Sequence, residues 1–157
     1  MEAARRATLG DLPRLAELCR AALAELGARE RGGRLYVVRE GRPQPVEETL
    51  GREVGDGRCL VLVGTVDGTI MGYCTGRTEP LRDGRRLGLL DELFVEEGAR
   101  GVGVGEAMMD EALAWFREQR CAGVDSTALP GARETKNFFE ESGFTARLLV
   151  MHRSLEE

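Results

Sequence analysis

A glycine-rich segment near the middle of the chain is the part of this sequence best suited to bind a phosphate. Gly101, Gly103 and Gly105 alternate with apolar residues, directly after an apolar stretch that ends in acids. Glycines between a strand and a helix let backbone N–H groups approach a ligand closely, and the helix N-terminus behind them carries partial positive charge. The segment therefore predicts a cradle for a phosphate or pyrophosphate. The structural alternative is a plain glycine-rich turn.

The spacing excludes two better-known phosphate loops. A dinucleotide fingerprint needs Gly-x-Gly-x-x-Gly, but the residue after Gly105 is Glu106. A P-loop needs Gly-Lys followed by Ser or Thr, and the segment has no such ending. A carboxylate at Glu106 suits the start of a helix but repels a pyrophosphate, so we expect its side chain to point outward.

Two adjacent acids, Asp91 and Glu92, lie on the predicted strand that enters this loop. A carboxylate at such a position could act as a general base, which accepts a proton from a reacting group directly or through a water molecule. Because side chains alternate along a strand, we expect the two carboxylates on opposite faces, with only one in a substrate cleft. Glu92 is the favoured base because its side chain is longer. The alternative is a structural carboxylate bonded to neighbouring backbone.

Composition indicates one globular domain over residues 1–157, which is long enough to bury a real core. The net charge of −5 argues against a general nucleic-acid binder. No apolar run approaches the ~18 residues that cross a membrane, and the N-terminus lacks a signal-peptide pattern, so we predict a cytoplasmic protein without a membrane partner. The four cysteines are far apart and form no cluster with histidine, so neither a metal site nor a disulfide framework is predicted.

Hydrophobic periodicity predicts a mixed α/β order along the chain. The residues 28–58 are the least readable part, although 46–54 fits a short helix. The predicted strands are 4–8, 59–66, 69–78, 86–95, 121–129 and 144–154, and the predicted helices are 12–26, 104–119 and 133–142.

Three blocks of the sequence resemble the GNAT superfamily of N-acetyltransferases. Arg100, Gly103 and Gly105 match its acetyl-CoA pyrophosphate loop, residues 5–18 resemble its first strand and helix, and residues 136–144 resemble its Phe-Tyr-Glu-x-x-Gly-Phe segment. The blocks occur in family order, from about residue 5 to 153. The resemblance implies a three-layer α/β fold, with a mixed central sheet, helices on both faces and a splayed strand pair that holds pantetheine.

The resemblance also implies an activity. It predicts transfer of acetyl from acetyl-CoA, without a metal, to a primary amine that attacks directly in a ternary complex. Polyamine- and aminoglycoside-type members carry a similar acidic pair, which favours Asp91 or Glu92 as the group that contacts the amine. The acceptor is not readable from the sequence. Dimers are common in the family, so a homodimer stays open.

Cofactor contacts follow from the same resemblance. Backbone N–H groups of residues 102–106 would hold the pyrophosphate, Arg100 would position their loop, and backbone groups of Leu93 and Val95 would hold the acetyl carbonyl and pantetheine. Lys136 could reach the CoA phosphates. The implied cofactor-binding set is Leu93, Phe94, Val95, Arg100, Gly101, Val102, Gly103, Val104, Gly105, Glu106, Lys136 and Phe139.

Two positions depart from the family pattern. Phe139 stands where the family often has a tyrosine that protonates the CoA thiolate, and Ala132 stands where it often has asparagine. Tyr73 or Ser126 could replace the missing acid, or the thiolate could leave unassisted, because thiols ionise near pH ~8.5. These departures favour an alternative function, a non-catalytic acyl-CoA-binding or regulatory domain, whereas the acidic pair favours the enzyme.

Overall fold

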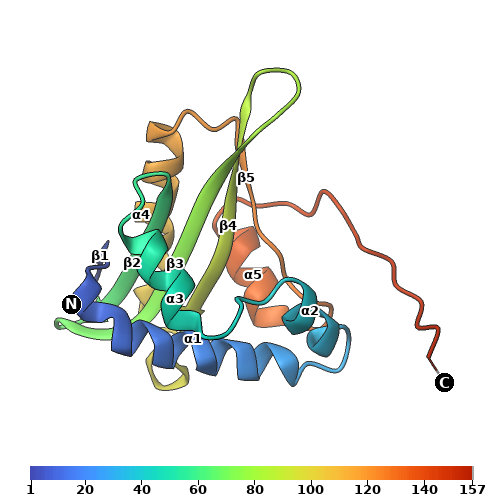
Figure 1. Cartoon of the computed structure of the whole chain (residues 1–157), viewed down its shortest axis with the longest axis horizontal. Helices are drawn as coiled ribbons and strands as arrows, with labels where there is room; N and C mark the ends of the chain where they lie inside the picture. Colours follow the sequence, from blue (N-terminus) through green and yellow to red (C-terminus); the bar gives the residue numbers. More distant parts are fainter. Residues whose placement is uncertain (157) are drawn as a thin grey trace.

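The apolar stretches of the chain form one mixed sheet, which the computed structural model describes over residues 1–156 (Figure 1). Residue 157, the last of the predicted domain, lies outside the described residues. Four strands are antiparallel neighbours, and the fifth runs parallel to the fourth. In sheet order they are β1 (Glu2–Arg6), β2 (Cys59–Val66), β3 (Thr69–Pro80), β4 (Arg86–Val95) and β5 (Gly123–Asp125).

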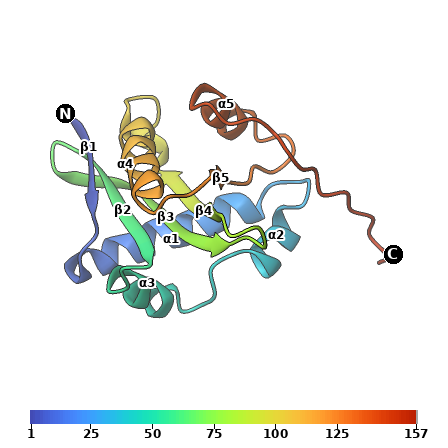
Figure 2. The same ribbon diagram turned by 90° about the horizontal axis from the view of Figure 1, so that it is seen from above.

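Helices cover both faces of the sheet, as predicted (Figure 2). One face carries α1 (Leu12–Gly27) and α3 (Val46–Val54), with α2 (Gly33–Arg39) packed against α1. The other face carries α4 (Val104–Glu118), and α5 (Arg133–Glu141) follows β5. Within residues 1–156, no helix combines the length and the apolar composition that crossing a bilayer requires.

Alternation along β2 divides the core into two clusters. Val61 and Val63 pack under α1 and α3, whereas Leu60 and Leu62 pack under α4. All four side chains are almost fully buried. Since successive strand side chains point to opposite faces, one continuous apolar run supplies both cores. This explains why the stretch reads as uninterrupted apolar sequence.

Several predicted boundaries are confirmed. The strands 59–66 and 86–95 and the short helix 46–54 end at the predicted residues. The hairpin between β2 and β3 turns at Asp67 and Gly68, which both have positive φ, at 48° and 85°. Positive φ at both central residues is the type I′ geometry that the Asp-Gly pair favours.

The C-terminal prediction is wrong. Residues 144–154 form no strand, and the chain after α5 runs away from the body of the molecule (Figure 1). The strand predicted over 121–129 is shorter and is limited to β5. Helix α2 was not predicted, because residues 28–45 show no readable pattern. A strand exists only where a neighbour pairs with it, and apolar composition alone cannot supply that neighbour.

Gly88 on β4 lets the sheet approach α4 closely. A Cβ built at Gly88 would lie 2.5 Å from Cδ1 of Phe116. Gly88→Ala should therefore lower the free energy of unfolding by about 1–3 kcal/mol, because the core would be overpacked. Gly57→Ala is the matched control, since a Cβ there meets nothing within 4 Å. Urea unfolding measures both variants, and equal midpoints would contradict this account of the packing.

Candidate functional site

The central feature of the site is the place where β5 separates from β4. The two strands pair only at Leu87 with Gly123, Gly88 with Val124 and Leu89 with Asp125. Beyond Leu89, β4 continues to Val95 with no strand on that side in the described residues. Buried backbone N–H and C=O groups need partners, so this edge of β4 is open to an extended ligand.

Ser126 marks the point of separation. Its Oγ donates a hydrogen bond of 3.0 Å to the carbonyl oxygen of Leu90, in place of the next interstrand bond. The predicted ligand-holding residues Leu93 and Val95 lie further along the open part of β4. The sequence-predicted backbone contacts therefore fall on the segment that β5 leaves unpaired.

The glycine loop closes the far end of this opening. After a short 3-10 helix (η2, Glu97–Ala99), Gly101 and Gly103 have φ values of 80° and 97°, in the left-handed region that favours glycine. Gly103 directly precedes α4, whose first N–H groups have no partner within the helix. These groups and the helix dipole make the loop suited to an anion.

Arg100 fastens the loop to its surroundings. Its Nε donates to the carbonyl oxygen of Val95 at 2.8 Å, and Nη2 donates to Oε2 of Glu25 on α1 at 2.7 Å. Its guanidinium carbon lies 5.4 Å from the centre of the Phe94 ring. Arg100 thus ties the end of β4 to α1, which fits the predicted role of positioning the loop.

Two other predicted cofactor residues, Glu106 and Lys136, lie on the helices α4 and α5. Glu106 is exposed in the first turn of α4, as expected for a carboxylate kept away from an anion. Phe138 of α5 packs over the loop. A Cβ placed at Gly105 would lie only 3.2 Å from Cε1 of its ring. Lys136 is exposed on α5 and forms an ion pair of 3.0 Å with Glu140.

Phe139 lies in an aromatic cluster. Its ring centre is 5.9 Å from that of Phe138 and 5.2 Å from that of Phe144. The candidate substitutes for the missing tyrosine acid are engaged elsewhere. Tyr73 is buried and donates to Glu92 at 2.7 Å, and burial together with the Glu92 charge raises the pKa of its hydroxyl well above the usual value. Ser126 donates to Leu90, as described above.

A β-bulge changes the predicted orientation of the acidic pair. Thr75 of β3 faces Glu92 and Gly76 faces Leu90, so Asp91 is an extra residue on β4. An extra residue resets the alternation of side chains. Leu90 packs in the α4-side core, whereas Glu92 contacts Tyr73 and Asp91 pairs with Arg77 on the α1 side. The prediction that the two acids face opposite sides of the sheet is wrong.

Glu92 is held by several donors. Its carboxylate accepts from the Thr75 hydroxyl at 2.7 Å, from the Tyr73 hydroxyl at 2.7 Å, and from Arg42 Nη2 at 2.5 Å and Nε at 3.2 Å. Burial alone would raise the pKa of this carboxyl, but the hydrogen bonds and charge of Arg42, with the two hydroxyl donors, hold it below its usual value. The carboxylate is therefore stabilised in its charged form.

Arg42 is the site residue that the sequence did not reveal. Its side chain is only 7% exposed and lies between the carboxylates of Glu92 and Glu53, with a further hydrogen bond of 2.9 Å to Thr49. It comes from the connector between α2 and α3, inside residues 28–58, where seven arginines and six acids are interspersed without a pattern. The sequence does not show which of these arginines pairs with the buried carboxylate of Glu92, fifty positions away.

Asp91 is in a different environment. It keeps 38% of its side chain exposed and accepts from Arg77 Nε at 2.9 Å. Burial raises the pKa of this carboxyl, and the lowering effect of Arg77 does not offset it. Asp91 is thus the acid of the pair that binds a proton more readily.

Helix α2 closes the site on the side of the acidic pair. The Tyr36 hydroxyl lies 3.0 Å from Oγ1 of Thr127, just beyond β5. This contact joins α2 to the segment that follows the separation of the strands. In residues 1–156, no group of three or more His, Cys, Asp or Glu side chains is arranged to hold a metal ion.

The sequence model of the Acetyltransferase (GNAT) family matches residues 18–144. The chain belongs to the GNAT family of acetyltransferases. Acetyl-CoA is the cosubstrate that this family generally uses. No curated protein sequence matches the chain.

Solved structures share the GNAT fold at low sequence identity. A mutant of the BH1408 protein from Bacillus halodurans has a TM-score of 0.81 at 20% identity, over 98% of this chain and 99% of that chain. An aminoglycoside acetyltransferase from an uncultured soil metagenomic sample, in complex with sisomicin, has a TM-score of 0.72 at 18% identity, over 99% and 96%. A ribosomal-protein-alanine N-acetyltransferase from Brucella melitensis biovar Abortus 2308 has a TM-score of 0.69 at 20% identity, over 99% and 100%.

The environment of Glu92 predicts a pH-dependent contribution to stability. Its pKa is lowered in the folded protein, so its contribution is fully present above the unfolded pKa of about 4.3 and is lost as pH falls through the folded value. Glu92→Gln should therefore reduce the free energy of unfolding at pH 7, and the difference from wild type should shrink as the pH falls below about 4.

Denaturant unfolding over a pH series measures this difference. Glu118→Gln, at an exposed position on α4, is the matched control and should stay close to wild type throughout. A Glu92→Gln deficit that stays constant with pH would show that the Glu92 charge is not what stabilises the site.

Proposed function

We propose that the protein is an acetyl-CoA-dependent N-acetyltransferase, in which a primary amine attacks the thioester directly in a ternary complex. The observation that carries this proposal is the open edge of β4 with the glycine loop at its end. Acetyl-CoA has an anionic pyrophosphate at one end and an amide-bearing arm that ends in the thioester. The loop suits the pyrophosphate, and the unpaired backbone of β4 suits the arm as an added strand.

The proposed cofactor contacts are those that the family resemblance implied. Backbone N–H groups of residues 102–106 bind the pyrophosphate, and backbone groups of Leu93 and Val95 bind the arm and the acetyl carbonyl. Arg100 holds the loop against β4 and α1, which the contacts described above support. Lys136 and Phe139 on α5 border the opposite side of the cofactor.

Proton transfer is the step that the acidic pair would assist. The amine nitrogen forms a bond to the thioester carbon as the carbon–sulfur bond breaks, and the nitrogen loses a proton. Asp91 is the better proton acceptor of the pair, because its pKa is raised and part of its side chain is exposed. Glu92, which the sequence favoured, is engaged by Arg42 and two hydroxyls, so we assign it chiefly to positioning.

The departing thiolate has no tyrosine at the family position. The ring of Phe139 cannot donate a proton, and Tyr73 is committed to Glu92. We propose that the CoA thiolate leaves without a protein acid, which its pKa near ~8.5 allows. This step differs from that of family members with tyrosine at this position.

A cationic acceptor suits the charges around the pair. Asp91, Glu92 and Glu53 face Arg42 and Arg77, which leaves the carboxylates in excess. An excess of negative charge attracts an ammonium group to the site. Solved structures with this fold include an aminoglycoside acetyltransferase and a ribosomal-protein-alanine N-acetyltransferase, so the fold does not identify the acceptor. A panel of amines tests which acceptor is used, and release of the free CoA thiol measures the reaction.

A second candidate is a non-catalytic acyl-CoA-binding or regulatory domain, which Phe139 and Ala132 favour. The amine panel separates the two functions. Thiol release that depends on an added amine supports the enzyme. Tight binding of acetyl-CoA, without thiol release on any amine of the panel, supports the binding domain.

The cofactor proposal predicts a thermal shift. Acetyl-CoA should raise the Tm, because a ligand that binds only the folded state stabilises it by mass action. Gly103→Asp should abolish this shift through bulk and negative charge in the loop. The control is Gly84→Asp, on the distant hairpin between β3 and β4, where φ is 89° and a side chain is similarly strained.

Differential scanning fluorimetry with and without millimolar acetyl-CoA reads the result. Both variants should have a lower Tm without ligand, but only Gly84→Asp should keep the ligand-induced shift. A shift that survives in Gly103→Asp, or no shift in the wild type, would overturn the assignment of the loop.

The acidic pair predicts two unlike mutants. Asp91→Asn should lower kcat on the order of 100-fold at neutral pH, as the loss of a general base does, and the rate should recover as rising pH deprotonates the amine. Glu92→Gln should mainly lower the Tm. Steady-state kinetics over a pH series, with acetyl-CoA binding checked in each variant, tests both statements. Small and equal effects on kcat would leave solvent as the only proton acceptor.

A further inference from the structure

The ion pair of Arg77 and Asp91 leaves binding groups of both signs unused. Nε of Arg77 donates to Oδ2 of Asp91 at 2.9 Å, and within residues 1–156 neither side chain makes another hydrogen bond. A guanidinium carries its N–H donors in a rigid fork, so those on Nη1 and Nη2 are left over, as is Oδ1 of the carboxylate. The two side chains are 53% and 38% exposed, so a ligand from solvent reaches both.

The pair lies in line with the proposed position of the thioester. Because side chains alternate along β3, Arg77 shares the sheet face of Thr75, which belongs to the site on the α1 side. Arg77 stands opposite Leu89 of β4, whereas Leu93, the proposed contact of the acetyl group, lies about 7 Å beyond Asp91 along the same strand. A molecule that extends from the thioester therefore meets Asp91 first and Arg77 second.

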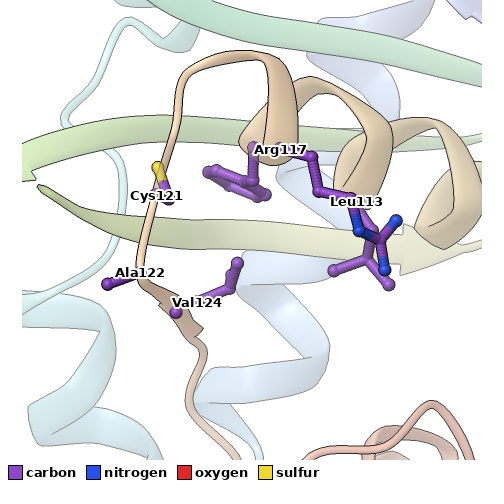
Figure 3. A pocket seen from close by; sticks show the side chains of 7 residues that line it. Leu113, Arg117, Cys121, Ala122 and Val124 are labelled. Atoms are coloured by element: carbon purple, nitrogen blue, oxygen red, sulfur yellow. The ribbon is translucent and has the colours of Figure 1, made fainter.

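A hollow on the other face of the sheet offers no such pair. It lies between the C-terminal end of α4 and β5 (Figure 3). Its lining includes Leu113, Phe116 and Val124 from the α4-side core, and its one charged side chain is that of Arg117. Since no carboxylate lines this hollow, it has no group to attract an ammonium or to accept its proton. The acceptor amine is better placed on the face of Asp91.

Helix α2 limits the size of the acceptor on that face. After its C-terminal end, Arg42 pairs with the buried carboxylate of β4. Within the helix, the Tyr36 hydroxyl lies 3.0 Å from Oγ1 of Thr127. Before the helix, Nη2 of Arg31 lies 3.1 Å from where a Cβ of Gly131 would be. Fixed at both ends, α2 closes this side of the site, which favours a compact acceptor over a long peptide or a folded protein.

We propose that the acceptor is a compact zwitterion, an α-amino acid or a close analogue, whose carboxylate binds the fork of Arg77 and whose ammonium binds Asp91. This acceptor class rests on the acetyltransferase function proposed above. A guanidinium fork binds a carboxylate through two parallel hydrogen bonds. Because one ion pair holds Arg77 and Asp91 together, the two charges of the acceptor also have to be close together, as they are in an α-amino acid. Arg77 is then the residue that determines specificity.

Asp91 handles the first proton of this acceptor. The ammonium gives one proton to Asp91 and becomes a neutral amine. The amine nitrogen bonds to the thioester carbon as the carbon–sulfur bond breaks, and the electron pair of that bond leaves with the CoA thiolate. The nitrogen releases its second proton to water, and Asp91 later returns the first proton to water. The product amide is neutral at nitrogen, so it no longer binds Asp91 as a cation and can dissociate.

Matched acceptors test the role of Arg77. Each α-amino acid of a panel is compared with its α-carboxamide, and release of the CoA thiol gives kcat/KM for both. In Arg77→Gln, the ratio of amino acid to carboxamide should fall on the order of 10- to 100-fold, through a higher KM for the amino acid, because a hydrogen-bonded charge pair is lost. Arg77→Lys should restore part of the ratio. Arg85→Gln, which removes an exposed arginine paired with Asp83, should keep the wild-type ratio.

The ratio is decisive because the lower pKa of a carboxamide's amine affects every variant alike. An unchanged ratio in Arg77→Gln, or transfer only to amines that lack a carboxylate, would overturn the acceptor class and leave the acetyltransferase function standing. No thiol release from any amine would overturn that function. Isothermal titration calorimetry in the presence of CoA repeats the comparison without transfer. Tighter binding of the amino acid that depends on Arg77 would still support the site, and equal binding of both would overturn it.

Discussion

The structure depends on one constraint, the need of the β4 backbone for partners after β5 has left it. The parallel pairing ends at Leu89, six residues before β4 itself ends at Val95. Ser126 satisfies the first freed carbonyl and Arg100 satisfies the last. Between them residues 1–156 provide no strand, and a ligand with amide groups can take that place. The glycine loop lies at the end of the same opening because β4 runs directly into it.

A second constraint is the burial of Glu92. The bulge at Asp91 places both acids on the α1 side, where Glu92 is enclosed by Tyr73 and Thr75. A buried carboxylate needs an opposite charge, and Arg42 supplies it from the connector between α2 and α3. This ion pair fixes an otherwise irregular segment to the central sheet. The bulge thereby leaves one acid, Glu92, enclosed by hydrogen-bond donors and the other, Asp91, more exposed.

Much of the fold and part of the site follow from the sequence by itself. The apolar run of β2 and the Asp67–Gly68 turn are local signals, so strand, turn and returning strand could be located to within a few residues. Gly101 and Gly103, which the sequence marked as a glycine-rich loop, have positive φ values, a geometry that few other residues tolerate. The order of the three blocks was enough to indicate the GNAT family, which the match over residues 18–144 shows.

The tertiary structure alone decided which groups meet. Nothing in the local sequence marks Arg42 among its neighbouring arginines, because its role depends on a carboxylate fifty positions away. The bulge that reorients Asp91 depends on register with β3, and register is a property of the pair of strands. Residues 144–154 have the composition of a strand but lack a neighbour in the folded chain, so composition predicted an element that pairing did not supply. Local patterns fix what a segment can become, and long-range pairing and burial decide what it is.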